Sequence, residues 1–476
     1  MIEDILDRQK AFFRTGKTLS VSFRKQYLKD LRDAVSGMDG EISAALKEDL
    51  GKSPVESYMC ETGMTLSELG HAVRHIREYS RRRRVHTPVS QFPAKSYIIP
   101  EPYGNVLIMS PWNYPFLLSL APLTSAVAAG NTVILKPSAY SPATSAVIKK
   151  LVGKVFPEEY VAVAEGGRDV NAGLLEQKFD YIFFTGSKAV GRLVMSKASV
   201  HLTPVTLELG GKSPVIVDRT ADIRTSARRI VFGKFLNCGQ TCVAPDYVLV
   251  HEDVADAFVE SCKAETAAMF GDDPIGNPDY GKIVNRKHFD RLVSWLGEIG
   301  GENVRTQEAV DGAARIVHGG RADAGRLKIE PTIVRAGSIS GPSAERYTIM
   351  QEEIFGPVLP VLSYTDMDEV IRYVDGHPRP LAAYIFTEDR KTRETLLGRL
   401  HFGGGCVNDT IIHLATEAMP FGGVGESGMG NYHGRYGFET FSHLKSIVDK
   451  PVWLDLPMRY QPYGKMKDRI IRRFLR

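Results

Sequence analysis

The stretch NVLIMSPWNYPFLLSLAPLTSAVAAGNTVILKPS, residues 105–138, decides the fold. From 105 to 135 it contains no Asp, Glu, Lys or Arg, and an uncharged run of this length resembles a membrane-spanning helix. Pro111, Pro115, Pro122 and Gly130 interrupt the run, however, and proline and glycine mark the ends of regular elements. The pattern therefore predicts a strand, a loop, a helix and a second strand, all buried in a parallel α/β core.

Strands and helices continue to alternate after this stretch. The apolar runs VLIM, TVILK, VAVAEG and YIFFTG are predicted strands, and helices are predicted between them and after the last one. This alternation predicts parallel βαβ units. Ligands bind beyond the carboxyl ends of the strands in such sheets, so we expect one crevice at the loops that contain Trp112, Lys136, Gly166 and Thr185.

Composition narrows the class of protein. The chain has 476 residues, 43% hydrophobic and 24% charged, which predicts two or three folded domains and excludes a largely disordered protein. A formal net charge of +4 is small for this length, so we expect no nucleic-acid partner. Five scattered cysteines and a start without a signal-peptide pattern favour a cytoplasmic protein.

Three short motifs are weak signals when each is taken alone. YIFFTGSKAVG is a strand, a turn with Gly186 and a helix start, where backbone N–H groups can bind phosphate and Ser187 can contact a diphosphate or cap the helix. LELGGKSP places Glu208 at a strand end, where an acid can act as a base or be an ordinary surface group. NCGQTCVAP places Cys242 in a glycine-containing loop, although most lone cysteines are buried and inert.

The other cysteines and histidines favour no metal site. Cys238 lies four residues before Cys242, but no companion His/Cys cluster in the sequence completes a set of four ligands. His413 and His433 lie in loops near the C-terminal motif, where we interpret them as structural or rim residues. We therefore predict no bound metal.

Seven motifs in one order along the chain together resemble those of the aldehyde dehydrogenase superfamily. The resemblance runs from about residue 5 to about residue 450. GKFLNCGQTCVAPDYVLV and GMGNYHGRYGFETFSH look most like the class 3 branch, which acts on fatty or aromatic aldehydes. The motifs are SPWNYPF, VILKPS, FTGSKAVG, TLELGGKSP, GQTCVAP, QEEIFGPV and PFGGVGESGMG.

The resemblance implies oxidation of an aldehyde to a carboxylic acid through a cysteine thioester. Cys242 matches the nucleophile, which adds to the carbonyl as a thiolate. Asn113 matches the side-chain donor to the oxyanion, beside the backbone N–H of Cys242. Glu208 matches the base that activates water against the thioester. Glu353 matches a group that positions the nicotinamide ribose, and it remains an alternative base.

The resemblance also implies NAD or NADP as cofactor. Lys136 matches the ligand of the adenosine ribose hydroxyls, Ser187 a diphosphate contact, and Phe355 a group beside the nicotinamide ring. The common pattern K-P-S-E is replaced by KPSA, so Ala139 stands where an acid accepts from the ribose 2′-OH and repels a 2′-phosphate. The expected cofactor-binding turn also contains Thr185, Gly186 and Gly191.

The expected substrate is an apolar aldehyde, with Tyr114, Phe232 and Phe402 predicted in the wall of its pocket. Two other functions remain open. A CoA-acylating enzyme would pass the thioester to a thiol carrier, but Glu208 argues against it, because such members of the family usually lack this acid. A catalytically silent scaffold could keep the fold, although the set of Cys242, Glu208, Asn113, Lys136 and Glu353 is complete.

The expected architecture is an α/β protein with a doubly wound parallel-sheet cofactor domain. Before residue 105, SYII could form an edge strand or a hairpin arm. The predicted parts are a dinucleotide-binding domain (1–92 and 105–207), a second α/β catalytic domain (208–441), a small bridging and oligomerisation β-sheet (93–104 and 442–457) and a basic C-terminal tail (458–476).

The C-terminal tail and the predicted bridging strands are the segments that we expect to contact partners. The resemblance implies a homodimer, and an exposed strand such as SHLKSIVDKP could add to a partner's sheet. The tail carries seven basic groups and one acid, and a helix there would bring Met466, Ile470, Ile471, Phe474 and Leu475 near one face. Such a helix could pack on the partner subunit, or it could make weak peripheral contact with an anionic membrane.

Overall fold

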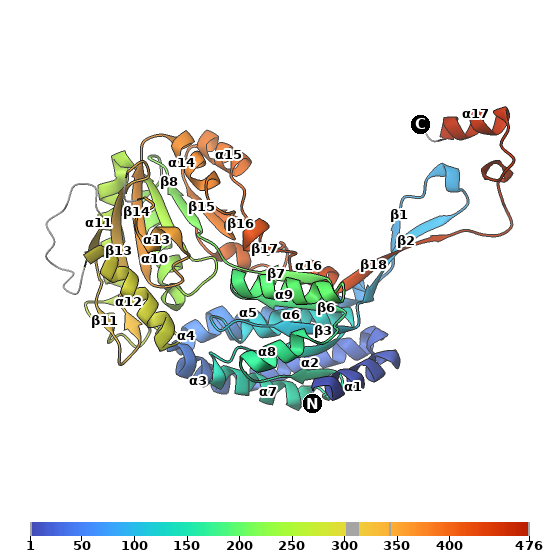
Figure 1. Ribbon diagram of the computed structural model, residues 1–476, viewed down its shortest axis with the longest axis horizontal. Coiled ribbons are helices and arrows are strands. Elements are labelled where there is room, and N and C mark those ends of the chain that lie inside the picture. Colours follow the sequence, from blue (N-terminus) through green and yellow to red (C-terminus); the bar gives the residue numbers. More distant parts are fainter. Residues whose placement is uncertain (1, 301–313, 342–343, 475–476) are drawn as a thin grey trace.

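A computed structural model describes residues 2–300, 314–341 and 344–474 of the chain (Figure 1). Two α/β units lie next to each other, each built around its own sheet, and an arm of strands and a helix extends from the unit that contains the N-terminus. The predicted fold class is confirmed.

The first unit contains a six-stranded sheet in the order β17-β7-β6-β3-β4-β5. The five strands from β7 to β5 are parallel, as the alternation of strands and helices predicts, and β17 is antiparallel to β7. The strands are β3 (Asn105–Met109), β4 (Thr132–Lys136), β5 (Val161–Val163), β6 (Tyr181–Thr185), β7 (Val205–Glu208) and β17 (Gly428–Met429).

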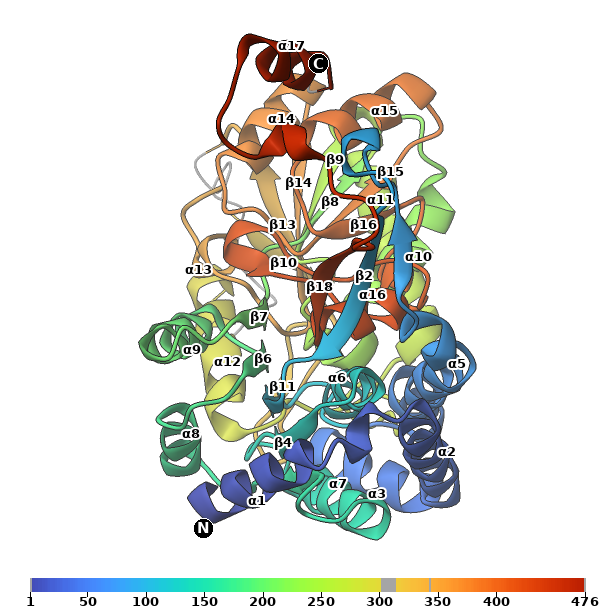
Figure 2. The same cartoon turned by 90° about the vertical axis from the view of Figure 1, so that its right-hand side faces the viewer.

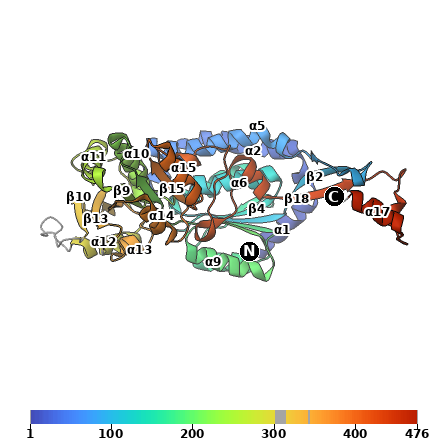
Figure 3. The ribbon, with the colours of Figure 1, turned by 90° about the horizontal axis from the view of Figure 1, so that it is seen from above.

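Helices cover both faces of this sheet, so the fold is doubly wound (Figure 3). Side chains alternate along β3: Val106 and Ile108 join the cluster under α2, α5 and α6, whereas Leu107 and Met109 join the cluster under α1, α8 and α9. The helices are α1 (Ile2–Arg14), α2 (Val21–Gly37), α3 (Asp39–Leu50), α4 (Pro54–Ser57), α5 (Gly63–Tyr79), α6 (Leu117–Ala129), α7 (Pro142–Val155), α8 (Arg168–Leu175), α9 (Lys188–Val200) and α16 (Gly434–Thr440).

The second unit contains a seven-stranded sheet in the order β10-β13-β14-β9-β8-β15-β16, parallel except for β10. Its strands are β8 (Pro214–Val217), β9 (Tyr247–His251), β10 (Arg315–His318), β13 (Thr332–Ser338), β14 (Val358–Tyr364), β15 (Ala382–Phe386) and β16 (Gly404–Val407), and β11 (Ala322–Asp323) pairs separately with β12 (Lys328–Ile329). Its helices are α10 (Ile223–Phe235), α11 (Glu252–Phe270), α12 (Arg286–Gly300), α13 (Thr348–Gln351), α14 (Met367–Asp375) and α15 (Arg390–Arg399).

The predicted boundaries of the second unit differ from the sheet arrangement at both ends. Glu208, its predicted first residue, is the last residue of β7 in the first sheet. Near its predicted end, Gly428 pairs with Glu208 and Met429 with Leu207. The physical reason is that β7 would otherwise leave one side of its backbone unpaired. Helix α16 then packs on α5 and α6, so residues 428–440 belong with the first sheet.

The arm consists of a three-stranded sheet in the order β1-β2-β18, followed by a terminal helix (Figure 2). The two stretches predicted as bridging strands pair antiparallel from Ser442↔Pro102 to Asp449↔Lys95. SYII therefore lies in one arm of the hairpin formed by β1 and β2, which was one of the two predicted alternatives, and it is not an edge strand because β18 pairs with its other side. Strand β1 begins ten residues before the predicted boundary at 93. The elements are β1 (Arg83–Val85), β2 (Lys95–Pro102), β18 (Ser442–Asp449) and α17 (Lys465–Phe474).

The uncharged run at 105–135 forms β3, a loop, α6 and β4, as predicted. In the described part of the chain, no helix has both the length and the apolar character needed to cross a membrane. The remaining short helices are η1 (Lys17–Leu19), η2 (Tyr58–Thr62), η3 (Val89–Gln91), η4 (Leu236–Gly239), η5 (Ile412–Leu414), η6 (Gly425–Ser427) and η7 (Pro457–Arg459).

Candidate active site

Cys242 lies in the loop that follows α10, and a left-handed turn directs the chain there. Asn237, Cys238 and Gly239 have φ values of 52°, 53° and 73°. The turn is tight against a neighbouring segment, since a Cβ on Gly239 would lie 2.2 Å from the carbonyl oxygen of Gly356. This geometry brings the half-buried Cys242 to the wall of a cavity of about 190 Å³.

Glu208 enters the same cavity from the carboxyl end of β7. The residue is 2% exposed, and neither carboxylate oxygen has a hydrogen-bond partner among the described residues. Burial therefore raises the pKa of Glu208 well above its usual range. A buried acid with free oxygens beside a thiol is suited to proton transfer.

Glu353 approaches from the second unit. Its carboxylate lies against Gly210, where an added Cβ would be 2.3 Å from Oε1. Burial and the charge of Asp246 raise the pKa of Glu353 to about 7. Burial and the carboxylates of Glu353 and Glu208 together raise the pKa of Cys242 to about 12. Both predicted acids therefore act electrostatically on the predicted nucleophile.

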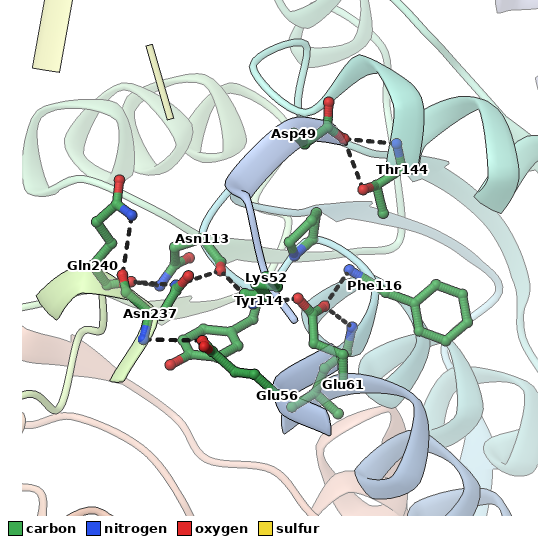
Figure 4. Close-up of polar contacts among 12 residues, drawn as sticks. Asp49, Lys52, Glu56, Glu61, Asn113, Tyr114, Phe116, Thr144, Asn237 and Gln240 are labelled. Carbon is green, nitrogen blue, oxygen red and sulfur yellow. Dashed lines mark hydrogen bonds and ion pairs between the residues drawn. The ribbon is translucent and has the colours of Figure 1, made fainter. Parts of the chain in front are cut away.

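Asn113 lies beside the cysteine loop, outside the residues that line the cavity. Its Nδ2 donates to the carbonyl oxygen of Gln240 at 3.0 Å, two residues before Cys242 (Figure 4). An amide nitrogen carries two N–H groups, so one remains for another acceptor. The backbone carbonyl of Asn113 accepts from Asn237 at 2.7 Å and from Lys52 at 3.2 Å.

The carboxyl ends of β4 and β6 and the start of α9 surround a second cavity, of about 540 Å³. Lys136, Thr185, Gly186 and Ser187 all line it, together with Ala139. Thr185 also lines the cavity at Cys242, so the two cavities adjoin.

This second cavity fits a dinucleotide. Burial lowers the pKa of Lys136 to about 8, and its Nζ donates to the Pro137 carbonyl at 2.7 Å. Ser187 caps α9 by accepting from the Val190 N–H, which leaves the hydroxyl hydrogen for a ligand. Buried oxygens of Ser110 and Asn171 line the cavity with no partner in the described ranges. These groups suit a ligand that has many hydroxyl groups and places its negative charge at the N-terminus of a helix.

Three predicted cofactor residues lie outside the lining of this cavity: Gly191, Glu353 and Phe355. A Cβ on Gly191 would lie 2.9 Å from Cδ2 of Leu209, so this glycine allows close packing of α9 on the chain after β7. Phe355 has a φ of 47° and packs edge-on against Trp112, which does line the cavity.

The lining of the cavity at Cys242 is mainly apolar, as predicted for the substrate pocket. Tyr114 is part of it, with its hydroxyl 2.6 Å from that of Thr241, and so is Phe232, which is 40% exposed. The prediction for Phe402 is wrong, since it lies in the turn before β16 and packs on the core of the second unit. Sequence analysis missed Leu236, which lies within the quoted stretch around Cys242, and other lining residues from outside the motifs: Met59, Met64, Leu118, Ile411, Ile412 and Leu414.

The two histidines noted in the sequence differ in position. His433 lines the pocket, with Nδ1 3.3 Å from the Glu68 carboxylate. Nδ1 of His413 lies 3.6 Å from the sulfur of Cys406, outside the lining. Over the ranges that the structure describes, no three His, Cys, Asp or Glu side chains are grouped to hold a metal.

An apolar cavity lined by a cysteine and an acid adjoins a dinucleotide cavity, and this arrangement defines a dinucleotide-dependent oxidoreductase. The model of the aldehyde dehydrogenase family matches residues 1–447. The chain belongs to this family, and it is an NAD(P)-dependent enzyme that oxidises aldehydes to acids.

Similar proteins cover nearly the whole chain. The 4,4'-diaponeurosporen-aldehyde dehydrogenase of Staphylococcus aureus is 46% identical over 98% of each chain. Aldehyde dehydrogenase family 3 member H1 of Arabidopsis thaliana is 41% identical over 97% of this chain and 92% of its own. A solved structure described as the substrate-bound state of Staphylococcus aureus AldH has a TM-score of 0.94 and 45% identity over 100% of both chains.

Proposed function

We propose that the enzyme oxidises apolar aldehydes, with Cys242 as nucleophile. The observation that carries this proposal is the apolar wall around the sulfur, to which Leu117, Phe232 and Leu236 contribute. An apolar chain gains free energy when such a wall removes it from water. The Staphylococcus aureus relative, whose name specifies 4,4'-diaponeurosporen-aldehyde, supports the same class of substrate.

In the proposed reaction the sulfur of Cys242 adds to the aldehyde carbon. Its thiol first loses its proton to water, although the charges of Glu208 and Glu353 raise the pKa of the thiol. The oxyanion that forms accepts from the backbone N–H of Cys242 and from the free N–H of the Asn113 amide. Bound NAD or NADP would accept the hydride that leaves the adduct's carbon, and loss of this hydride converts the adduct into a thioester. Glu208 then takes a proton from a water molecule that attacks the thioester, and the acid and the free thiol are released.

Other residues are proposed to hold the cofactor. Lys136 binds the adenosine ribose, and Ser187 and the N-terminal turn of α9 bind the diphosphate. Glu353 and Phe355 position the nicotinamide ribose and ring. Thr185, Gly186 and Gly191 shape the turn between β6 and α9.

A panel of aldehydes tests the substrate class. For saturated aldehydes we expect kcat/KM to rise about fourfold per added methylene until the cavity is full, since each buried methylene contributes about 0.8 kcal/mol. Aromatic aldehydes should also be good substrates, and short aldehydes that carry a carboxylate should be poor ones. The measurement is NAD(P)H formation with each cofactor. A preference for charged or very short aldehydes would contradict the proposal.

We propose that both NAD and NADP are used, because Ala139 places no acid in the dinucleotide cavity. Lys136, Arg168 and Lys287 line the same cavity, and their positive charges favour a phosphate. Ala139→Glu should lower kcat/KM for NADP+ roughly 10²-fold, since a carboxylate a few Å from a phosphate costs about 3 kcal/mol in a partly desolvated site.

The control for this variant is Ala139→Gln, which has the same length and no charge. It should reduce the use of NADP+ much less than Ala139→Glu, while NAD+ supports activity in both variants. Steady-state kinetics with each cofactor measure the effect. Equal losses with NAD+ and NADP+ in Ala139→Glu would show that charge at this position does not select the cofactor.

The arm supports a proposed homodimer. Five of the eight side chains of β18 are exposed, and α17 contacts little besides η7. We propose that α17 packs on a partner subunit with its basic residues in solvent. Its exposed Met466 and partly exposed Ile470 and Ile471 also suit weak contact with an anionic membrane, while Leu475 lies outside the described residues. A cytoplasmic location is proposed, supported by five unpaired cysteines.

A further inference from the structure

A fully buried ion pair lies between the N-terminal helices and the active-site loops. The side chains of Lys52, after α3, and Glu61, in η2, are both 0% exposed, and Nζ lies 2.5 Å from Oε1. Removal of two charges from water costs free energy that a single contact rarely recovers, so such a pair is a poor device for stability alone. Its other contacts indicate what it does.

The pair binds both sides of the loop that contains Asn113. The Nζ of Lys52 donates to the Asn113 carbonyl at 3.2 Å and lies 4.0 Å from the centre of the Tyr114 ring. Oε2 of Glu61 accepts from the N–H groups of Phe116 and Leu117 at 2.8 and 3.1 Å, at the start of α6 (Figure 4). The loop from 113 to 117 is therefore fixed through its backbone.

A second residue joins this loop to the cysteine loop. Nδ2 of Asn237 donates to the Asn113 carbonyl at 2.7 Å and to the Gln240 carbonyl at 3.1 Å. The Gln240 carbonyl also receives the Asn113 amide, and the Asn237 N–H donates to Glu56 at 3.0 Å. Asn237 tolerates its left-handed φ of 52° better than most residues. Asn113 is thus held from the Lys52 side and from the cysteine loop.

We propose that Lys52, Glu61 and Asn237 are positioning residues that set the Asn113 amide relative to the sulfur of Cys242. They do not touch substrate. They fix the carbonyl and the flanking backbone of Asn113, so that one amide N–H is held by Gln240 and the other is directed to the oxyanion. This inference rests on the proposed role of Asn113 in the reaction.

Two variants break the network in different ways. Lys52→Met combined with Glu61→Gln removes both charges, so no unpaired ion is left buried, and the introduced glutamine can still accept from the start of α6. Asn237→Gly removes the second donor and keeps the left-handed backbone without strain. If the double variant fails to fold, Asn237→Gly alone carries the test.

Asp49→Asn is the matched control. Asp49 is a buried acid three residues before Lys52, and it accepts from the backbone and hydroxyl of Thr144 at 2.7 Å, at the start of α7 (Figure 4). The described contacts of its carboxylate do not reach the Asn113 loop or the cysteine loop. Asp49→Asn should lower the melting temperature without changing the first turnover.

The readout is the rate of the first hydride transfer at saturating aldehyde and cofactor, beside the rate of Cys242 alkylation by iodoacetamide. In the network variants we expect the first rate to fall about 10²-fold, the typical effect of losing one oxyanion donor. Alkylation and cofactor affinity should stay near native values, because they need the sulfur and the dinucleotide cavity and form no aldehyde oxyanion. A general loosening of the site would change all three quantities together and would overturn the proposal.

Asn113→Ala separates the two hypotheses. If its first turnover is slow while folded network variants are native, the role of Asn113 stands and the positioning role is wrong. If Asn113→Ala itself has a native first turnover, the proposed oxyanion role fails, and with it the reason for the network. A slow first turnover in both Asn113→Ala and the network variants, with native alkylation, supports the proposal.

Discussion

Cys242→Ala is expected to abolish aldehyde oxidation and to leave cofactor binding intact. Without the sulfur no covalent adduct can form, and loss of a nucleophile lowers kcat by at least about 10⁴-fold. The dinucleotide cavity does not include Cys242 in its lining, so the affinity for NAD+ or NADP+ should change little. Stopped-flow measurement of NAD(P)H and calorimetric titration of the cofactor test the two halves of this prediction.

Cys406→Ala is the matched control, because Cys406 is the other half-buried cysteine and lies outside both cavities. This variant should retain native turnover. Substantial turnover by Cys242→Ala would mean that hydride transfer does not require a covalent intermediate on this residue.

Glu208→Gln is expected to complete one hydride transfer and then stall. Glutamine has nearly the same shape, and the Glu208 oxygens have no hydrogen-bond partner in the described parts of the chain, so the substitution should break no contact. Formation of the thioester does not need the base that activates water, whereas hydrolysis of the thioester does. We expect a burst of one NAD(P)H per active site, followed by turnover lowered about 10²- to 10⁴-fold.

The pH dependence of the stalled step distinguishes the two acids. A general base acts when deprotonated, so the rate rises with pH through its pKa. If Glu353 were the base, kcat would rise around pH 7, since burial raises the pKa of Glu353 to about 7. Burial raises the pKa of Glu208 well above its usual range as well, so the variant in which the rise disappears, Glu353→Gln or Glu208→Gln, identifies the acid that causes it. If Glu353→Gln stalls after one hydride transfer while Glu208→Gln has native steady-state turnover, then Glu353 is the base that activates water and Glu208 is not.

The sequence predicted the parallel core well, because local patterns encode it. Each strand of the first sheet from β3 to β6 is an apolar run with a proline or glycine nearby, and helix follows strand without exception there. The place of β17 was not predictable in this way. Pairing of Gly428 with Glu208 depends on an unfilled strand edge that exists only in the folded first unit.

The residues of the candidate site could be predicted where a motif contains the residue and the fold places that motif at the cavity. Cys242 and Glu208 each stand inside a motif, and both line one cavity. Phe402 lies in no motif, and it packs on the core of the second unit instead of lining the pocket. Lys52 was missed because its partner Glu61 and its acceptor Asn113 are distant in sequence, so no local pattern indicates the contact.

The pairing of β17 with β7 also determines the order in which a working site can be assembled during protein synthesis. The strand that presents Glu208 acquires its edge partner at Gly428, and His433 completes the pocket wall shortly afterwards. Both lie far beyond Cys242 in the sequence, so a ribosome must add this whole interval before the pocket closes around the cysteine. Contacts between such distant segments form slowly. An incomplete nascent chain, which already carries the thiol, therefore lacks the enclosed pocket in which that thiol would trap an aldehyde.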